Sequence, residues 1–206
     1  MRERGINLVL VDHPAHRPDQ CSVAVNDVAG GRLAVAHLLD RGARRIVFVS
    51  GPSSIRQCRD RLEGARQAVL EAGLDPARAL AVQTVTSMNA GCGQQVAETL
   101  LASGTLPDAV FCANDLLALG LLRGLLQAGV RVPGDVMLIG YDDIDFAAAS
   151  AVSLSSITQP TYRLGRIATQ LLLDECDNPE RHSHQQIMFQ PTLVVRESTA
   201  AQIATS

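Results

Sequence analysis

The feature that most constrains the fold of this chain is the alternation of short, continuous apolar segments with longer amphipathic ones. Residues 46–49, 109–112 and 136–139 are almost entirely apolar, as expected of strands covered on both faces. The segments between them repeat apolar residues at helical spacing, and a glycine such as Gly42 or Gly129 favours the end of a helix. This alternation predicts an α/β fold built on a doubly wound parallel sheet.

The composition argues against several classes of protein. The chain carries a formal net charge of -3, so it offers no general basic surface for nucleic acid. No apolar run approaches the roughly 20 residues that span a bilayer, and the N-terminus lacks the pattern of a signal peptide. The cysteines are scattered with no CxxC pair: Cys21, Cys58, Cys92, Cys112 and Cys176. We therefore expect reduced thiols and a cytoplasmic protein with no membrane partner.

Polar residues follow several of the predicted strands. Asp12, Ser50, Asn114 and Asp142 each stand where an apolar segment ends, and Arg61 lies near the start of a predicted helix. In a doubly wound sheet, ligands bind in the crevice beyond the carboxyl ends of the strands. Carboxylates, an amide and a guanidinium together suit a small polar ligand with several hydroxyl groups. The pattern predicts a binding site rather than a reaction centre.

Each of these residues also has a purely structural interpretation. Asn114 is well placed to cap the helix that follows it, and Asp12 precedes a His-Pro pair at a natural turn. Asp142 belongs to a turn after a glycine, and Arg61 stands in an arginine-rich stretch that predicts a solvated helix face. Only their expected convergence on one edge of the sheet favours the functional interpretation.

Other candidate motifs predict no chemistry. His182 and His184 stand in a polar loop with no cysteine or carboxylate recognised as a partner, so we expect no metal site. Residues 91–93 lack the full dinucleotide fingerprint, and no phosphate-binding loop occurs. No nucleophile stands beside a positioned base. We expect no enzyme activity and no cofactor.

Several sequence blocks follow one another in a fixed order along most of the chain. They comprise Gly51-Pro52 with Arg61-Leu62 and Gly64, and the runs 108–120, 132–136, 139–143, 154–159 and 191–198. The run 139–143 is Ile-Gly-Tyr-Asp-Asp, and the closing run is Pro-Thr-Leu-Val-Val-Arg-Glu-Ser. In this order and spacing the blocks resemble the lactose-repressor (LacI/GalR) family of bacterial transcription regulators.

The resemblance implies a two-lobed, periplasmic-binding-protein-like core with a small effector held between the lobes. Carried over by position, Arg61 and Asp142 match the main polar effector contacts of the family. Other positions that face the effector in the family are here Asn114, Asp12, Gln159, Gln57 and Met88. Gln57 replaces a common small hydroxyl residue and Met88 a common aromatic one. A sugar is the implied effector, and a nucleoside-like molecule is the alternative.

The resemblance also implies how the chain divides. Residues 26–158 with 189–198 would form the C-terminal lobe, and residues 1–25 with 161–188 would be parts of the N-terminal lobe. The helix-turn-helix would be absent from this chain. We expect the N-terminal parts to be poorly supported, because the amphipathic helix near 164–172 needs a sheet to cover.

The implied function is effector sensing that controls operator binding allosterically, through a DNA-binding head outside this chain and as a homodimer in the full-length form. One alternative is a periplasmic-type sugar-binding protein of a transporter, which shares the fold. Another is a truncated regulator without function.

Overall fold

The computed structural model describes residues 6–200, which divide into two compact units. The smaller unit comprises residues 6–26 and 159–191, and the larger comprises residues 27–158 and 192–200. Each unit has its own sheet and its own core.

The larger unit is built on a six-stranded sheet in the order β4-β3-β5-β6-β7-β9. Its strands are β3 (Ile46–Ser50), β4 (Leu80–Thr84), β5 (Ala109–Cys112), β6 (Met137–Asp142), β7 (Ser155–Thr158) and β9 (Thr192–Val194). All neighbours are parallel except β7 and β9. The apolar run of β5 is buried at every position, as a central strand covered on both faces requires. The predicted α/β class and the parallel sheet are confirmed.

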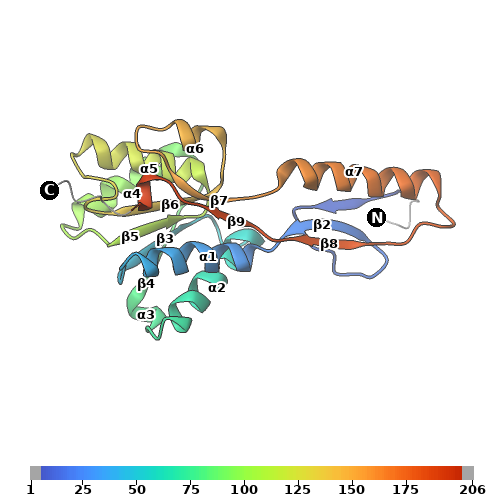
Figure 1. The fold of residues 1–206 in the computed structure, drawn as a ribbon, viewed down its shortest axis with the longest axis horizontal. Helices are drawn as coiled ribbons and strands as arrows, with labels where there is room; N and C mark the ends of the chain where they lie inside the picture. The colour runs from blue at the N-terminus through green and yellow to red at the C-terminus, as the bar shows by residue number, and fades with distance from the viewer. Residues whose placement is uncertain (1–5, 201–206) are drawn as a thin grey trace. The chain divides into compact units, whose positions relative to one another are not determined.

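Helices cover both faces of this sheet (Figure 1). They are α1 (Asp27–Asp40), α2 (Arg56–Glu71), α3 (Pro76–Ala79), α4 (Ala90–Ala102), α5 (Asp115–Gln127) and α6 (Asp145–Ala149), with a short 3-10 helix, η2 (Glu197–Thr199), near the end. α1 packs against α2, and α4 packs against α5. Gly64 of α2 lies so close to α1 that a Cβ there would collide with the Val28 carbonyl. Close backbone approach therefore fixes the pairing of these two helices.

The smaller unit contains three parallel strands in the order β1-β2-β8, covered by α7 (Thr161–Asp177). The strands are β1 (Val9–Val11), β2 (Cys21–Val25) and β8 (Gln186–Phe189). Leu164, Ala168 and Leu171 of α7 form a buried cluster with Cys21, Val23 and Val25 of β2. The expectation that this helix lacks a sheet to cover is wrong, because Cys21–Val25 forms a fully buried strand that the apolar pattern alone did not reveal.

Two boundaries of the units differ from the predicted ones, at Asn26 and at residues 189–191. Phe189 pairs with Val25 in the small sheet, and the Asn26 amide donates to the Phe189 carbonyl at 2.9 Å. Residues 189–191 therefore belong to the smaller unit. Among residues 6–200, no helix combines the length and the apolar character that crossing a bilayer requires.

Candidate functional site

The candidate site lies in the larger unit at the carboxyl ends of three neighbouring strands. Ser50 is the last residue of β3, Asn114 stands two residues after β5, and Asp142 is the last residue of β6. β3, β5 and β6 are adjacent and parallel, so their carboxyl ends meet at one edge of the sheet. The fold places these three polar residues on the edge where such sheets bind ligands.

Arg61 of α2 contacts both α1 and the residues at this edge of the sheet. Its side chain is buried, and its Nε donates to the Asp27 Oδ1 of α1 at 2.8 Å. Its Nη1 donates to the carbonyl of Ala113, the residue before Asn114. Its guanidinium carbon lies 3.5 Å from the ring centroid of Tyr141, the residue before Asp142. Arg61 therefore contacts Ala113 and Tyr141, the residues that directly precede Asn114 and Asp142.

Arg61 remains charged in spite of its burial. Burial by itself would lower its pKa, but Asp27, Tyr141 and Asp142 act in the opposite direction, and the net pKa is raised. Tyr141 has its pKa raised, chiefly by burial, and stays neutral. The interpretation of Arg61 as part of a solvated helix face is wrong, because its partner Asp27 lies on another helix and the pair is enclosed.

Asn114 caps the helix that follows it, as its structural interpretation predicts, and its contact with an effector stays a prediction. Its Oδ1 accepts a hydrogen bond from the Leu117 amide at 3.0 Å, which caps α5. Its Nδ2 donates to the Met88 carbonyl at 3.1 Å. The Met88 side chain lies over Gly51, where an added Cβ would approach its Cγ and Sδ at 2.9 Å. The structure thus brings Met88 to the same edge through the amide of Asn114.

Asp142 and Asp143 have an unusual backbone conformation. Their φ angles are 104° and 55°, both in the region that favours glycine. Such residues cost about 1–3 kcal/mol each and are frequent at binding sites. The Asp143 carboxylate accepts from Arg196 Nη2 at 2.7 Å, which holds the turn in place. Asp142 is half-buried at this turn, as a ligand contact at a strand end would be.

Asp115 is a positioning residue that the sequence did not reveal. It is fully buried, with one carboxylate oxygen accepting from Ser156 Oγ at 2.7 Å and the other from the Ile144 amide at 2.9 Å. Burial raises its pKa to about 6, although these two hydrogen bonds act to lower it. Asp115 therefore holds the segment that directly follows Asp142, through Ile144, and contacts the neighbouring strand β7, through Ser156. Its only sequence signal is an acidic residue in the first turn of a helix.

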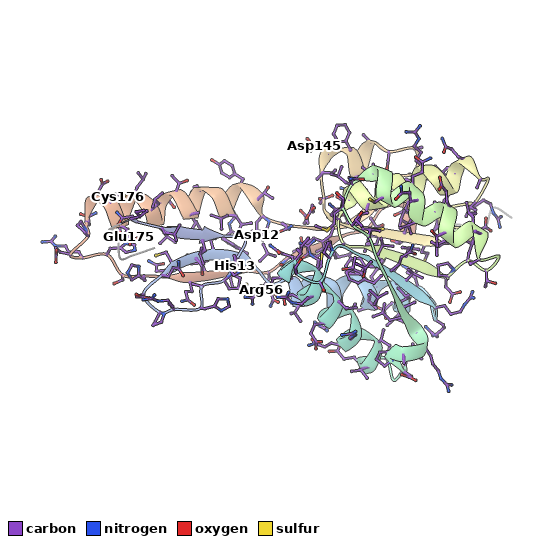
Figure 2. All side chains as sticks on the ribbon, turned by 180° about the vertical axis from the view of Figure 1, so that it is seen from behind. Asp12, His13, Arg56, Asp145, Glu175 and Cys176 are labelled. Carbon is purple, nitrogen blue, oxygen red and sulfur yellow. The ribbon has the colours of Figure 1, made fainter. Side chains whose placement is uncertain are left out.

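The remaining predicted contacts lie elsewhere. Gln57 is half-buried in the first turn of α2. Asp12 and Gln159 belong to the smaller unit, where Asp12 follows β1 with a φ of 56° (Figure 2). Contact of these residues with an effector stays a prediction.

In the smaller unit, His182 and His184 lie near a cysteine and a carboxylate, whereas the sequence analysis recognised no such partner. Cys21 Sγ lies 3.2 Å from His182 Nε2, and the Asp174 carboxylate lies 2.6 Å from His182 Nδ1. Neither partner could be recognised from the sequence, because Cys21 is 161 residues from His182 and Asp174 stands on the preceding helix.

Comparison with known proteins identifies clear relatives. A model described as a periplasmic binding protein-like domain matches residues 35–199. The transcriptional repressor PurR of Photobacterium profundum is 32% identical over 197 residues, covering 96% of this chain and 58% of the repressor. The ribose operon repressor of Haemophilus influenzae is 34% identical over 195 residues, covering 94% of this chain and 58% of that protein. The chain thus spans a little over half the length of these relatives.

A solved structure extends the likeness to three dimensions. The LacI family transcriptional regulator of Enterococcus faecium, crystallised with bound ribose, superposes with a TM-score of 0.88 at 30% identity. The match covers 97% of this chain and 72% of that one. The named curated relatives are repressors rather than enzymes.

Proposed function

Since this chain belongs to the LacI family of transcriptional regulators, we propose that it is the effector-sensing region of such a regulator. In this proposal the larger unit contributes Arg61, Asn114 and Asp142 to the binding of a small polyhydroxylated effector. The relatives include a ribose operon repressor and a regulator crystallised with ribose, so a sugar is the effector class that we favour.

The convergence of Arg61, Asn114 and Asp142 at the carboxyl ends of β5 and β6 is the observation that carries the proposal. The guanidinium contacts Ala113 and Tyr141, which directly precede the other two residues. A carboxylate accepts hydrogen bonds from sugar hydroxyls, whereas a guanidinium donates to hydroxyl and ring oxygens. These complementary groups suit a neutral ligand that both donates and accepts.

The proposal extends to the full-length regulator. There, effector binding would change operator affinity through a DNA-binding head, in the cytoplasm and as a homodimer. The predicted assignment of the smaller and larger units to the N-terminal and C-terminal lobes is part of this proposal. For this coupling the effector must bind the DNA-competent and DNA-free states with different affinity.

Calorimetric titration of the purified chain with a sugar panel that includes ribose and cellobiose tests the binding site. Asp142→Asn keeps the side-chain shape but removes the charge, and we expect it to weaken binding at least about tenfold, the loss of one charged hydrogen bond of about 1.5–3 kcal/mol. Asp135→Asn is the matched control, because Asp135 precedes β6 at the opposite end of the strand and pairs with Arg131. Equal affinity of the two variants for a bound sugar would remove Asp142 from the site.

A further inference from the structure

Three metal-ligating side chains gather at one end of the small sheet. Cys21 Sγ lies 3.2 Å from His182 Nε2 and 3.6 Å from His184 Nδ1, and the three atoms all lie within 4.8 Å of one another. Tetrahedral zinc, with bonds of about 2.3 Å to sulfur and about 2.0 Å to nitrogen, places sulfur and nitrogen about 3.6 Å apart. The observed spacings match this geometry with only small adjustment.

The surroundings of the cluster orient its members. Asp174 Oδ2 lies 2.6 Å from His182 Nδ1, so a proton on Nδ1 leaves the Nε2 lone pair directed at Cys21. A carboxylate behind a histidine is the arrangement that fixes the tautomer of metal-binding histidines. The Gln185 backbone amide donates to Cys21 Sγ at 3.4 Å, which holds the sulfur in its place beside the two histidines. We propose that Cys21, His182 and His184 bind Zn²⁺, with Asp174 as a positioning residue.

The same residues include a cysteine, a histidine and an aspartate in line, an order found in nucleophilic enzymes. Cys21, however, is fully buried, so an electrophile has no access to its sulfur. A catalytic Cys-His-Asp arrangement also gives no role to His184, whose ring lies edge-on to that of His182 with centroids 5.0 Å apart. A metal ion, in contrast, uses all three ligands.

The proposed metal would fasten the loop 178–185 to the start of β2. Cys21 is the first residue of β2, and the two histidines precede β8, so the site lies at the amino ends of the strands. Asp12 follows β1 at their carboxyl ends, whereas Glu175 and Cys176 lie at the far end of α7 (Figure 2). The site is therefore distinct, within the smaller unit, from the predicted effector contact Asp12. Metal binding would contribute directly to the stability of this unit.

Metal analysis of the chain, purified without a polyhistidine tag, tests the proposal. After dialysis against Zn²⁺ and removal of free ion, we expect one tightly held zinc per chain. Replacement by Co²⁺ is expected to give a sulfur-to-cobalt charge-transfer band and tetrahedral visible bands. Hydrogen exchange should show that Zn²⁺ slows the amides of residues 182–187. Zinc bound only as loosely as by unrelated proteins would overturn the proposal.

Variants locate the ion. Cys21→Ser should abolish the charge-transfer band, and His184→Ala should abolish tight binding. His184 is only half-buried, so His184→Ala should fold even if Cys21→Ser does not, and the proposal can still be tested. Asp174→Asn should weaken binding about 10- to 100-fold while the cobalt spectrum keeps its tetrahedral form. The controls are Cys176→Ser and the double change His13→Ala with His16→Ala, which alter exposed residues of the same unit. Loss of zinc in the controls, or its retention in His184→Ala, would contradict the assignment.

Discussion

At the scale of single residues, burial decides how the charges of the candidate site behave. The Asp27 and Arg61 side chains are each 6% exposed and 2.8 Å apart. The cost of removing two charges from water is offset only while both partners remain, so loss of either one leaves an uncompensated charge. Gly30 supports this arrangement, because a Cβ there would collide with the Tyr141 hydroxyl beside the pair. These residues form a closely packed, buried layer next to the residues that precede Asn114 and Asp142.

Asp115 is the residue whose titration should be visible in stability. Its pKa rises from an ordinary value near 4 to about 6 on folding, because burial disfavours the carboxylate. Between these values the native state binds the proton more tightly than the unfolded state, so the contribution of Asp115 is fully present below about pH 4 and is lost as the pH rises to about 6. The loss is on the order of 3 kcal/mol.

Urea unfolding of the wild type and of Asp115→Asn at a series of pH values measures this loss. We expect the stability of the wild type relative to the variant to fall between about pH 4 and pH 6 and to be level above it. Comparison with the variant cancels the titration of the other carboxyl groups. Parallel pH profiles for the two proteins would show that Asp115 has no raised pKa.

At the scale of elements, the sequence predicts the strands and helices that have a local apolar pattern. It misses elements whose burial depends on segments distant in the sequence. The apolar runs of β3, β5 and β6 were predictable because burial on both faces leaves a continuous local pattern. Cys21–Val25 was missed because the run is short, is interrupted by Ser22, and is buried only through α7 and the neighbouring strands. In the same way, the site residues that could be predicted were Arg61 and the polar residues at the carboxyl ends of the strands. Asp27 and Asp115 act through contacts with separate elements.

The pairing of α1 with α2 gives a prediction at this scale. Gly64→Ala puts a methyl group into the backbone of Val28, where neither helix has a side chain that can move aside. We expect a loss of about 1–3 kcal/mol in the free energy of unfolding, as for overpacked cores. Gly165→Ala is the matched control, since it lies in α7 with open space around it. That change should instead stabilise by about 0.5–1 kcal/mol, because alanine loses less backbone entropy in a helix.

Thermal or urea unfolding followed by circular dichroism distinguishes the two outcomes. A Gly64→Ala variant as stable as the wild type would mean that α1 and α2 move apart at little cost.

At the scale of the whole molecule, the chain contains two cores of very different size. The larger unit has fully buried residues on all of β3, β5 and β6 and on the helices at both faces. The core of the smaller unit comprises Cys21, Val23, Val25, Leu164, Ala168 and Leu171. Stabilisation by apolar burial scales with the area removed from water, so the smaller core supports far less stability.

We therefore expect the smaller unit to open while the larger unit is still folded. Native-state hydrogen exchange should show the amides of β2 and β8 exchanging through an opening of lower free energy than those of β3 and β5. Because any ligand that binds only the folded form raises the free energy of opening, added Zn²⁺ should slow exchange in β2 and β8 and leave β5 unchanged. A single free energy of opening for all these strands would mean that the two cores unfold as one cooperative unit, in spite of their separate packing.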